Sequence, residues 1–223
     1  MKEITIPTNK SIININANNT EVAITGEEIN YTKLSFSDDI KYNSYLNTTE
    51  NMNTLDLSQE LQQASFDYQF IKSMLLKEKK AILVDELAER VTIKEYRKDS
   101  QIKITLPKDS RETTINLIGK STNLTINNLL YQNISVQTKS GEIIMHDIDG
   151  EKAKVLSNQG DIRMQIDESA LNYNLKLNNK LGNIYKESLE KKEPEILKEI
   201  HSTIEAESIS EDINVLFLGR TKH

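Results

Sequence analysis

Three segments of this chain repeat one spacing of aliphatic residues around a glycine. In each, an aliphatic residue is followed five positions later by glycine, then by one polar residue and an isoleucine. An earlier, degenerate copy has threonine in place of the glycine. The copies are Val136–Ile143, Val155–Ile162, Leu177–Ile184 and, with Thr122 at the glycine position, Leu117–Leu124. This spacing indicates a structural unit that recurs about every 20 residues.

A unit of two short strands buries one apolar row per strand, but it cannot cover that row alone. Units stacked at the strand spacing of ~4.8 Å shield one another, and glycine suits the corner between strands because it adopts positive φ without a Cβ clash. The pattern therefore predicts a mainly β fold, a β-solenoid-like stack of short strands. It predicts structural corners at Gly141, Gly160 and Gly182 and an inward core ladder of Leu117, Val136, Val155, Leu177, Leu124, Ile143, Ile162 and Ile184.

The composition narrows the chemistry that the chain can perform. It has no Trp and only four Phe in 223 residues, so the core must be built from Ile, Leu and Val. The absence of Cys excludes disulfides, cysteine zinc sites and thiol catalysis. A formal net charge of −6 with dispersed basic residues makes nucleic acid a poor partner, because an acidic surface repels phosphates. No apolar window is long enough for a direct membrane span.

Alternating apolar and polar residues predict short strands outside the repeat as well. These segments are 4–6, 13–15, 22–24, 31–36, 82–84, 91–93, 102–106 and 213–218. We therefore expect a single β-repeat domain over 1–223. Its expected parts are N-terminal strands at 1–37, a helical insertion at 38–80, glycine-corner coils at 82–185 and a C-terminal cap at 186–223.

Two peripheral segments show helical spacing. From a plausible N-cap at Ser58, apolar residues recur at helical intervals up to Leu75, and basic residues follow at 77–80, as suits a helix C-terminus. The alternation of Phe66, Tyr68 and Phe70 leaves a strand open for the same segment. A second helix is predicted from Pro194, and its apolar face of Ile196, Leu197, Ile200 and Ile204 is expected to pack on the core. The charged stretch 186–198 is expected to form a solvated face, with a cap over the open end of the stack as the alternative.

These features resemble the bacterial putative-adhesin family, a family of β-strand repeats of unknown function. The resemblance is carried by Ile102-Lys103-Ile104-Thr105-Leu106-Pro107, a strand ending in Leu-Pro, and by the glycine-corner copies that follow it. It covers residues 82–185 well and the N-terminal strands loosely. It implies a single-stranded β-helix-like domain, often from Gram-positive bacteria, and the family defines no catalytic residues to carry over to this chain.

Several residues match fragments of functional motifs, and each has a simpler interpretation. His146-Asp147 lacks a third group that would orient the imidazole, so we expect a solvent-facing turn. Asp147–Glu151 lacks the remaining ligands of a calcium loop, so a β-turn is expected. Gly141, Gly160 and Gly182 are too far apart to form a phosphate loop. We therefore predict no catalytic residue, no cofactor and no metal site, and a protein that is not an enzyme.

Three function classes remain open. The first is a binding or adhesin-like module that presents a face of the stack to a protein or cell-envelope partner. The second is a self-assembling scaffold, a homo-oligomer formed through the coil edges. The third is a partner protein in the cell-envelope stress response. The first residues alternate without the apolar region of a signal peptide, so we expect a cytoplasmic protein, with the cell surface open if a longer native chain carries an export signal.

Overall fold

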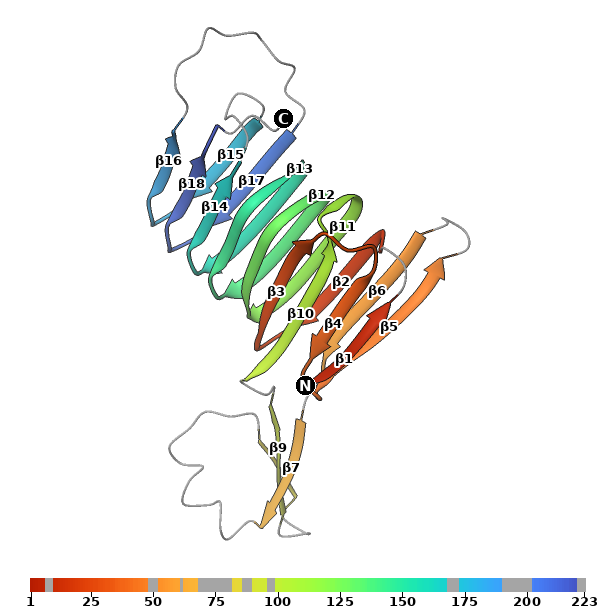
Figure 1. Cartoon of the computed structure of the whole chain (residues 1–223). Helices are drawn as coiled ribbons and strands as arrows, with labels where there is room; N and C mark the ends of the chain where they lie inside the picture. Colours follow the sequence, from red (N-terminus) through yellow and green to blue (C-terminus); the bar gives the residue numbers. More distant parts are fainter. Residues whose placement is uncertain are drawn as a thin grey trace, which may run out of the picture.

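The computed structural model describes residues 1–6, 10–47, 52–60, 62–67, 82–85, 90–95, 99–167, 173–189 and 202–219. In these residues every regular element is a strand, and most strands stack along one axis (Figure 1). The strands are β1 (Lys2–Ile6), β2 (Ile12–Ala17), β3 (Thr20–Glu27), β4 (Thr32–Phe36), β5 (Ile40–Asn47), β6 (Met52–Gln59), β7 (Gln62–Asp67), β8 (Ile82–Asp85), β9 (Arg90–Glu95), β10 (Ser100–Pro107), β11 (Asp109–Ser121), β12 (Asn123–Ser140), β13 (Ile143–Gln159), β14 (Ile162–Ile166), β15 (Tyr173–Asn179), β16 (Ile184–Ser188), β17 (Ser202–Ser208) and β18 (Ile213–Phe217).

The main sheet folds over into two layers because its two longest strands bend in the middle. The first half of β12 pairs with β3 and its second half pairs with β11, and β13 divides in the same way between β14 and β17. The first layer therefore runs β1-β4-β10-β3-β12-β13-β14-β18-β16. The second layer runs β5-β6-β2-β11-β12-β13-β17-β15. This is a β-solenoid-like stack in which one coil contributes a strand to each layer.

The core lies between the layers and consists of aliphatic rows that cross from coil to coil. Side chains alternate along a strand, so one residue in two points inward. One inward row of the first layer consists of Ile102, Val22, Leu124, Ile143, Ile162 and Ile213. The matching row of the second layer consists of Leu57, Ile15, Leu117, Val136, Val155 and Ala206. All twelve side chains are at most 2% exposed. Each coil thus covers the apolar row of its neighbour.

The corners and bends follow from local backbone chemistry. Gly141 and Gly160, which connect the second layer to the first, have φ of +120° and +147°. A Cβ at Gly160 would press against the backbone of Gly141, so glycine is needed at this stacked corner. The opposite bends, within β12 and β13, have positive φ at Asn128 and Asp147. Asn and Asp tolerate this conformation best after glycine.

The last coils do not stack in chain order. Strands β17 and β18, which come last in the chain, lie between the coil of β13 and β14 and the coil of β15 and β16 (Figure 1). Ala206 therefore separates Val155 from Leu177, and Ile213 separates Ile162 from Ile184. Leu177 is only partly buried and Ile184 is 42% exposed, because their coil ends the stack.

The prediction of a helix starting at Ser58 is wrong for the described residues. Ser58 lies in β6, which extends the main sheet, and 62–67 form β7, which joins β8 and β9 in a separate three-stranded sheet. The strand alternation around Phe66 is the pattern that holds there. Ile204, expected on a helical face, is a buried residue of β17. Residues 68–78 of the first predicted helix and 194–201 of the second lie outside the described residues.

The strands at 82–85 and 90–95 belong to that second sheet, and the chain rejoins the main sheet at β10. Pro107 is the last residue of β10, in line with the strand end expected there. No helix that could cross a membrane occurs in the described part of the chain.

Candidate functional site: the outer face of the first layer

The outer face of the first layer carries rows of side chains at one residue per strand. The row nearest the corners is called the corner row. Each of its residues comes one position before a residue of the inward row that contains Ile102 and Val22. In stack order they are Gln101, Glu21, Asn123, Glu142, Asp161, Asp212 and Asn183. Four are carboxylates and three are amides. Each is the outward neighbour of a buried aliphatic side chain or of Ile184, because strand side chains alternate.

Hydrogen bonds between successive coils hold the corner row in place. Asn123 Oδ1 accepts a bond of 3.0 Å from the backbone N–H of Glu142. Asp161 Oδ1 accepts one of 3.2 Å from the N–H of Asp212, and Asp212 Oδ1 accepts one of 2.8 Å from the N–H of Asn183. The polar residue of one coil therefore binds the corner of the next, which fixes both the corner and the side chain.

A second outward row, here the middle row, is less acidic. In stack order it reads Lys103, Ala23, Thr125, Ile144, Arg163, Asn214 and Tyr185. Its arginine joins the two rows. Arg163 Nη1 lies 2.7 Å from Glu142 Oε1 and Nη2 lies 2.8 Å from Asp161 Oδ2. The guanidinium thus compensates two adjacent carboxylates of the corner row.

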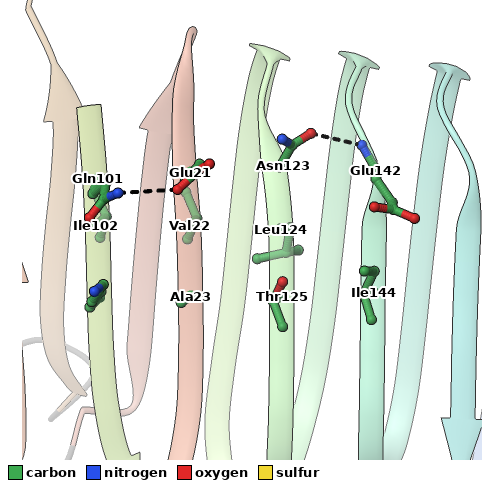
Figure 2. A pocket seen from close by; sticks show the side chains of 11 residues that line it. Glu21, Val22, Ala23, Gln101, Ile102, Asn123, Leu124, Thr125, Glu142 and Ile144 are labelled. Atoms are coloured by element: carbon green, nitrogen blue, oxygen red, sulfur yellow. Dashed lines mark hydrogen bonds between the residues drawn. The ribbon is translucent and has the colours of Figure 1, made fainter. Parts of the chain in front are cut away.

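A shallow pocket of about 300 Å³ lies where the middle row has its smallest side chain, Ala23 (Figure 2). Its walls come from strands β10, β3, β12 and β13. Gln101 Nε2 donates a 3.2 Å hydrogen bond to Glu21 Oε2 at its rim, and Asn123 and Thr125 line its other side. Side chains far apart in the chain therefore converge on one polar hollow.

The titratable groups with shifted pKa values lie away from this face. Burial raises the pKa of the Tyr131 phenol, and the charge of Asp149 adds to the rise. The hydrogen bond from Lys176 lowers the pKa of Glu205 on the second layer, and the charge of Lys176 acts in the same direction. Burial lowers the pKa of Lys10. None of these three shifts points to acid–base chemistry on the outer face of the first layer.

The predicted motif residues occupy simple structural positions. His146 is exposed on β13, and Asp147 Oδ1 accepts a 3.0 Å hydrogen bond from Gln165. The segment 147–151 is a bend inside β13 and not a free loop, and Asp149 Oδ1 accepts a 2.9 Å bond from the Tyr173 hydroxyl. Gly182 forms the corner between β15 and β16, without the positive φ of Gly141 and Gly160. Within the described residues no cluster of His, Asp and Glu is arranged for a metal ion.

Sequence reasoning missed the corner row as a surface. The signal was present in the repeat itself, since one polar residue follows each glycine: Glu142, Asp161 and Asn183. Once these coils stack, residues that follow the corner must line up on the outer face. The contributions of Glu21 and Asp212 were hidden because their copies of the repeat have no glycine.

The fold and this face define a class of protein: a β-solenoid-like repeat with glycine corners and a patterned polar face. The family model of Toastrack DUF4097 matches residues 10–221, and the chain belongs to this family. The resemblance to bacterial putative adhesins is thereby confirmed.

Two solved structures are similar to this chain at low sequence identity, and the first of them shares its fold. A putative cell adhesion protein from Clostridium sporogenes is 13% identical, with a TM-score of 0.54 over 97% of this chain and 99% of that one. A putative adhesin from Bacteroides fragilis is 14% identical, with a TM-score of 0.32 over 97% of both chains. Among curated proteins, none matches this chain.

Proposed function

We propose that this protein is a non-catalytic, adhesin-like binding module that presents the outer face of its first layer to a cell-envelope partner. One observation carries the proposal: polar side chains from successive coils converge on this face and are already held by hydrogen bonds and ion pairs. Side chains that are fixed before binding lose little conformational entropy on binding. Such a face suits recognition.

The same contacts argue against catalysis on this face. A general acid or base must exchange a proton with a reacting group. Glu142 and Asp161 are both engaged by Arg163, and Asp212 accepts from Asn183, so these carboxylates act as structural acceptors. The Clostridium structure is described as a putative cell adhesion protein, which agrees with a binding role.

Self-assembly through the coil edges is the second candidate function, and one observation favours it. Four large apolar side chains of the terminal coil, Leu181, Ile184, Tyr185 and Leu189, are between 42% and 79% exposed. Exposed apolar groups at an unpaired strand edge invite association. The inward row of β16 disfavours self-assembly, however, because this row carries Lys186 and Ser188 at the positions where β18 carries Val215 and Phe217. Inward charges of this kind block strand addition.

Co-sedimentation with envelope fragments of a Gram-positive bacterium tests the proposed function. Ala23→Arg places a long charged side chain in the hollow of the first layer, whereas Ser135→Arg places it on the outer face of the second layer. We expect the unmodified protein and Ser135→Arg to sediment with the fragments and Ala23→Arg to stay in solution. Failure of the unmodified protein to sediment, or equal sedimentation of both variants, would refute a partner on this face.

A further inference from the structure

A second hollow of about 240 Å³ lies further along the same outer face. It lies at Asn214, whose two neighbours in the middle row, Arg163 and Tyr185, have larger side chains. Met164 of β14 and Val215 of β18 also line it, and the next outward row supplies Gln165 and Leu216. Strands β13, β14, β16 and β18 thus build one concave surface.

The side chains around this hollow have a specific chemistry. Tyr185 presents a ring that is 48% exposed, and an aromatic ring offers an apolar face with a polar tip. Asn214 and Gln165 add planar amides, each of which both donates and accepts hydrogen bonds. A ligand that has apolar C–H faces and many hydroxyl groups meets all of these groups at once. Carbohydrates have this combination.

The charges around the hollow disfavour an anionic ligand. Arg163 is the cation nearest to Asn214 in the middle row, and it is already compensated by Glu142 and Asp161. Glu187 adds a further carboxylate to the lining. A phosphate or sulfate would have to compete with carboxylates for the arginine. An uncharged ligand has no such competition, and the remaining N–H groups of Arg163 are able to donate to hydroxyls.

The two hollows lie on one continuous strip. The first spans β10, β3, β12 and β13, and the second spans β13, β14, β18 and β16, so β13 lines both. Polar rows repeat along the strip at the strand spacing of ~4.8 Å. One sugar residue of an extended polysaccharide covers a similar length, so successive sugars meet successive coils. A single sugar would occupy only part of the strip.

We infer that the outer face of the first layer binds an uncharged linear polysaccharide, with one sugar stacked on Tyr185 in the hollow above Asn214. The inference rests on the proposed binding function and specifies its ligand. The bound polysaccharide lies along the stack axis and reaches from Tyr185 toward Thr125 in the first hollow. Hydroxyl groups are bound by the amides and by Arg163, and the tyrosine ring contacts a C–H face.

Affinity electrophoresis in native gels containing a soluble polysaccharide tests this inference. The probes are hydroxyethyl cellulose, a linear β-1,3-glucan and glycol chitin, with dextran sulfate as the anionic comparison. Two variants change the hollow in opposite ways: Tyr185→Ala removes the ring, and Asn214→Leu fills the space. Tyr42→Ala is the matched control, because Tyr42 is 47% exposed but lies on β5 at the other end of the stack. Thermal melts establish that each variant is folded.

We expect at least one uncharged polysaccharide to retard the protein, without loss of retardation at high salt. Both Tyr185→Ala and Asn214→Leu should weaken binding roughly tenfold, the loss of one stacking contact, while Tyr42→Ala binds like the unmodified protein. Retardation by dextran sulfate alone, with salt sensitivity, would overturn the uncharged ligand. Full binding by Asn214→Leu would overturn the site. Face-dependent binding to envelope fragments without retardation by any uncharged polysaccharide would overturn this inference and leave the proposed function standing.

Discussion

Lys186 on β16 lies opposite Val215 on β18 in the parallel register of the two strands. A lysine therefore occupies a row that is apolar in every inner coil, from Ile104 and Ile24 to Met145 and Met164. Ser188 likewise lies opposite Phe217. The terminal coil thus has the backbone of a repeat but an inward row that cannot serve as core for a further coil.

This relationship predicts that the terminal coil limits stacking. Replacing its two polar inward residues with those of β18, as Lys186→Val with Ser188→Phe, should create an apolar end that pairs with a second copy. Light scattering should then show an apparent mass that rises with concentration, while the unmodified protein shows a constant mass. The control, Lys176→Val with Asn178→Phe, adds the same side chains on the outward row of β15. A constant mass for the inward double variant would contradict the prediction.

Val155 should be among the positions most sensitive to charge. It is fully buried, with Val136 on one side and Ala206 on the other. Val155→Asp places an unpaired carboxylate in the core and should cost about 3–5 kcal/mol of unfolding free energy, measured by urea denaturation. Ser135→Asp puts the same carboxylate outward on the neighbouring strand and should change stability by roughly 0.5 kcal/mol or less. Equal effects would mean that Val155 does not face the core.

The loss of unfolding free energy on replacing a corner glycine with alanine should depend on the backbone conformation of that glycine. Gly160→Ala combines positive φ with a Cβ that meets the backbone of Gly141, and it should lower the unfolding free energy by about 1–3 kcal/mol. Gly182→Ala should cost less, because its backbone has no positive φ and its Cβ meets the carbonyl of Glu211 at the open end. Chemical denaturation of both variants, with exposed Asn158→Ala as a neutral reference, measures the order. A larger loss at Gly182 would reverse this reasoning.

Tyr131 should make the fold sensitive to high pH. Its phenol is buried near Asp149, which raises its pKa above the ordinary value of 10.0. The unfolded chain therefore loses this proton at lower pH than the folded chain does. The stability from the neutral phenol is complete below about pH 10 and decreases as the pH rises toward the folded pKa. Denaturation at pH 8 and above pH 10 should show a smaller pH-dependent loss for Tyr131→Phe than for the unmodified protein. An identical loss in both would show that another group carries it.

Much of the fold could be predicted from the spacing of the repeat. The aliphatic residues at Val136 and Ile143 are seven positions apart, and the same interval separates Val155 from Ile162. The structure shows two further copies with this interval but without glycine, Ile15–Val22 and Ala206–Ile213. The glycine was the conspicuous signal, but the interval is the feature that all coils share. Glycine alone therefore does not reveal the coil of β17 and β18.

The candidate site could be predicted only in part. That a polar residue follows each corner glycine is local information, and so is its outward direction opposite an inward isoleucine. Which polar residues become neighbours is not local. Arg163 meets Glu142 across coils, and Asn214 comes between Arg163 and Tyr185 only because β18 lies between β14 and β16. The second hollow could not be derived without that order.

The sequence by itself determined which side of each strand faces inward, because alternation and the seven-residue interval are properties of adjacent residues. Tertiary structure decided the order in which the coils stack. The physical reason lies in the inward rows of the last two coils. The apolar residues Ile213, Val215 and Phe217 need a neighbouring coil on both sides to bury them. The polar residues Lys186 and Ser188 need access to water on one side of their coil. The coil of β17 and β18 therefore lies inside the stack, and the coil of β15 and β16 ends it.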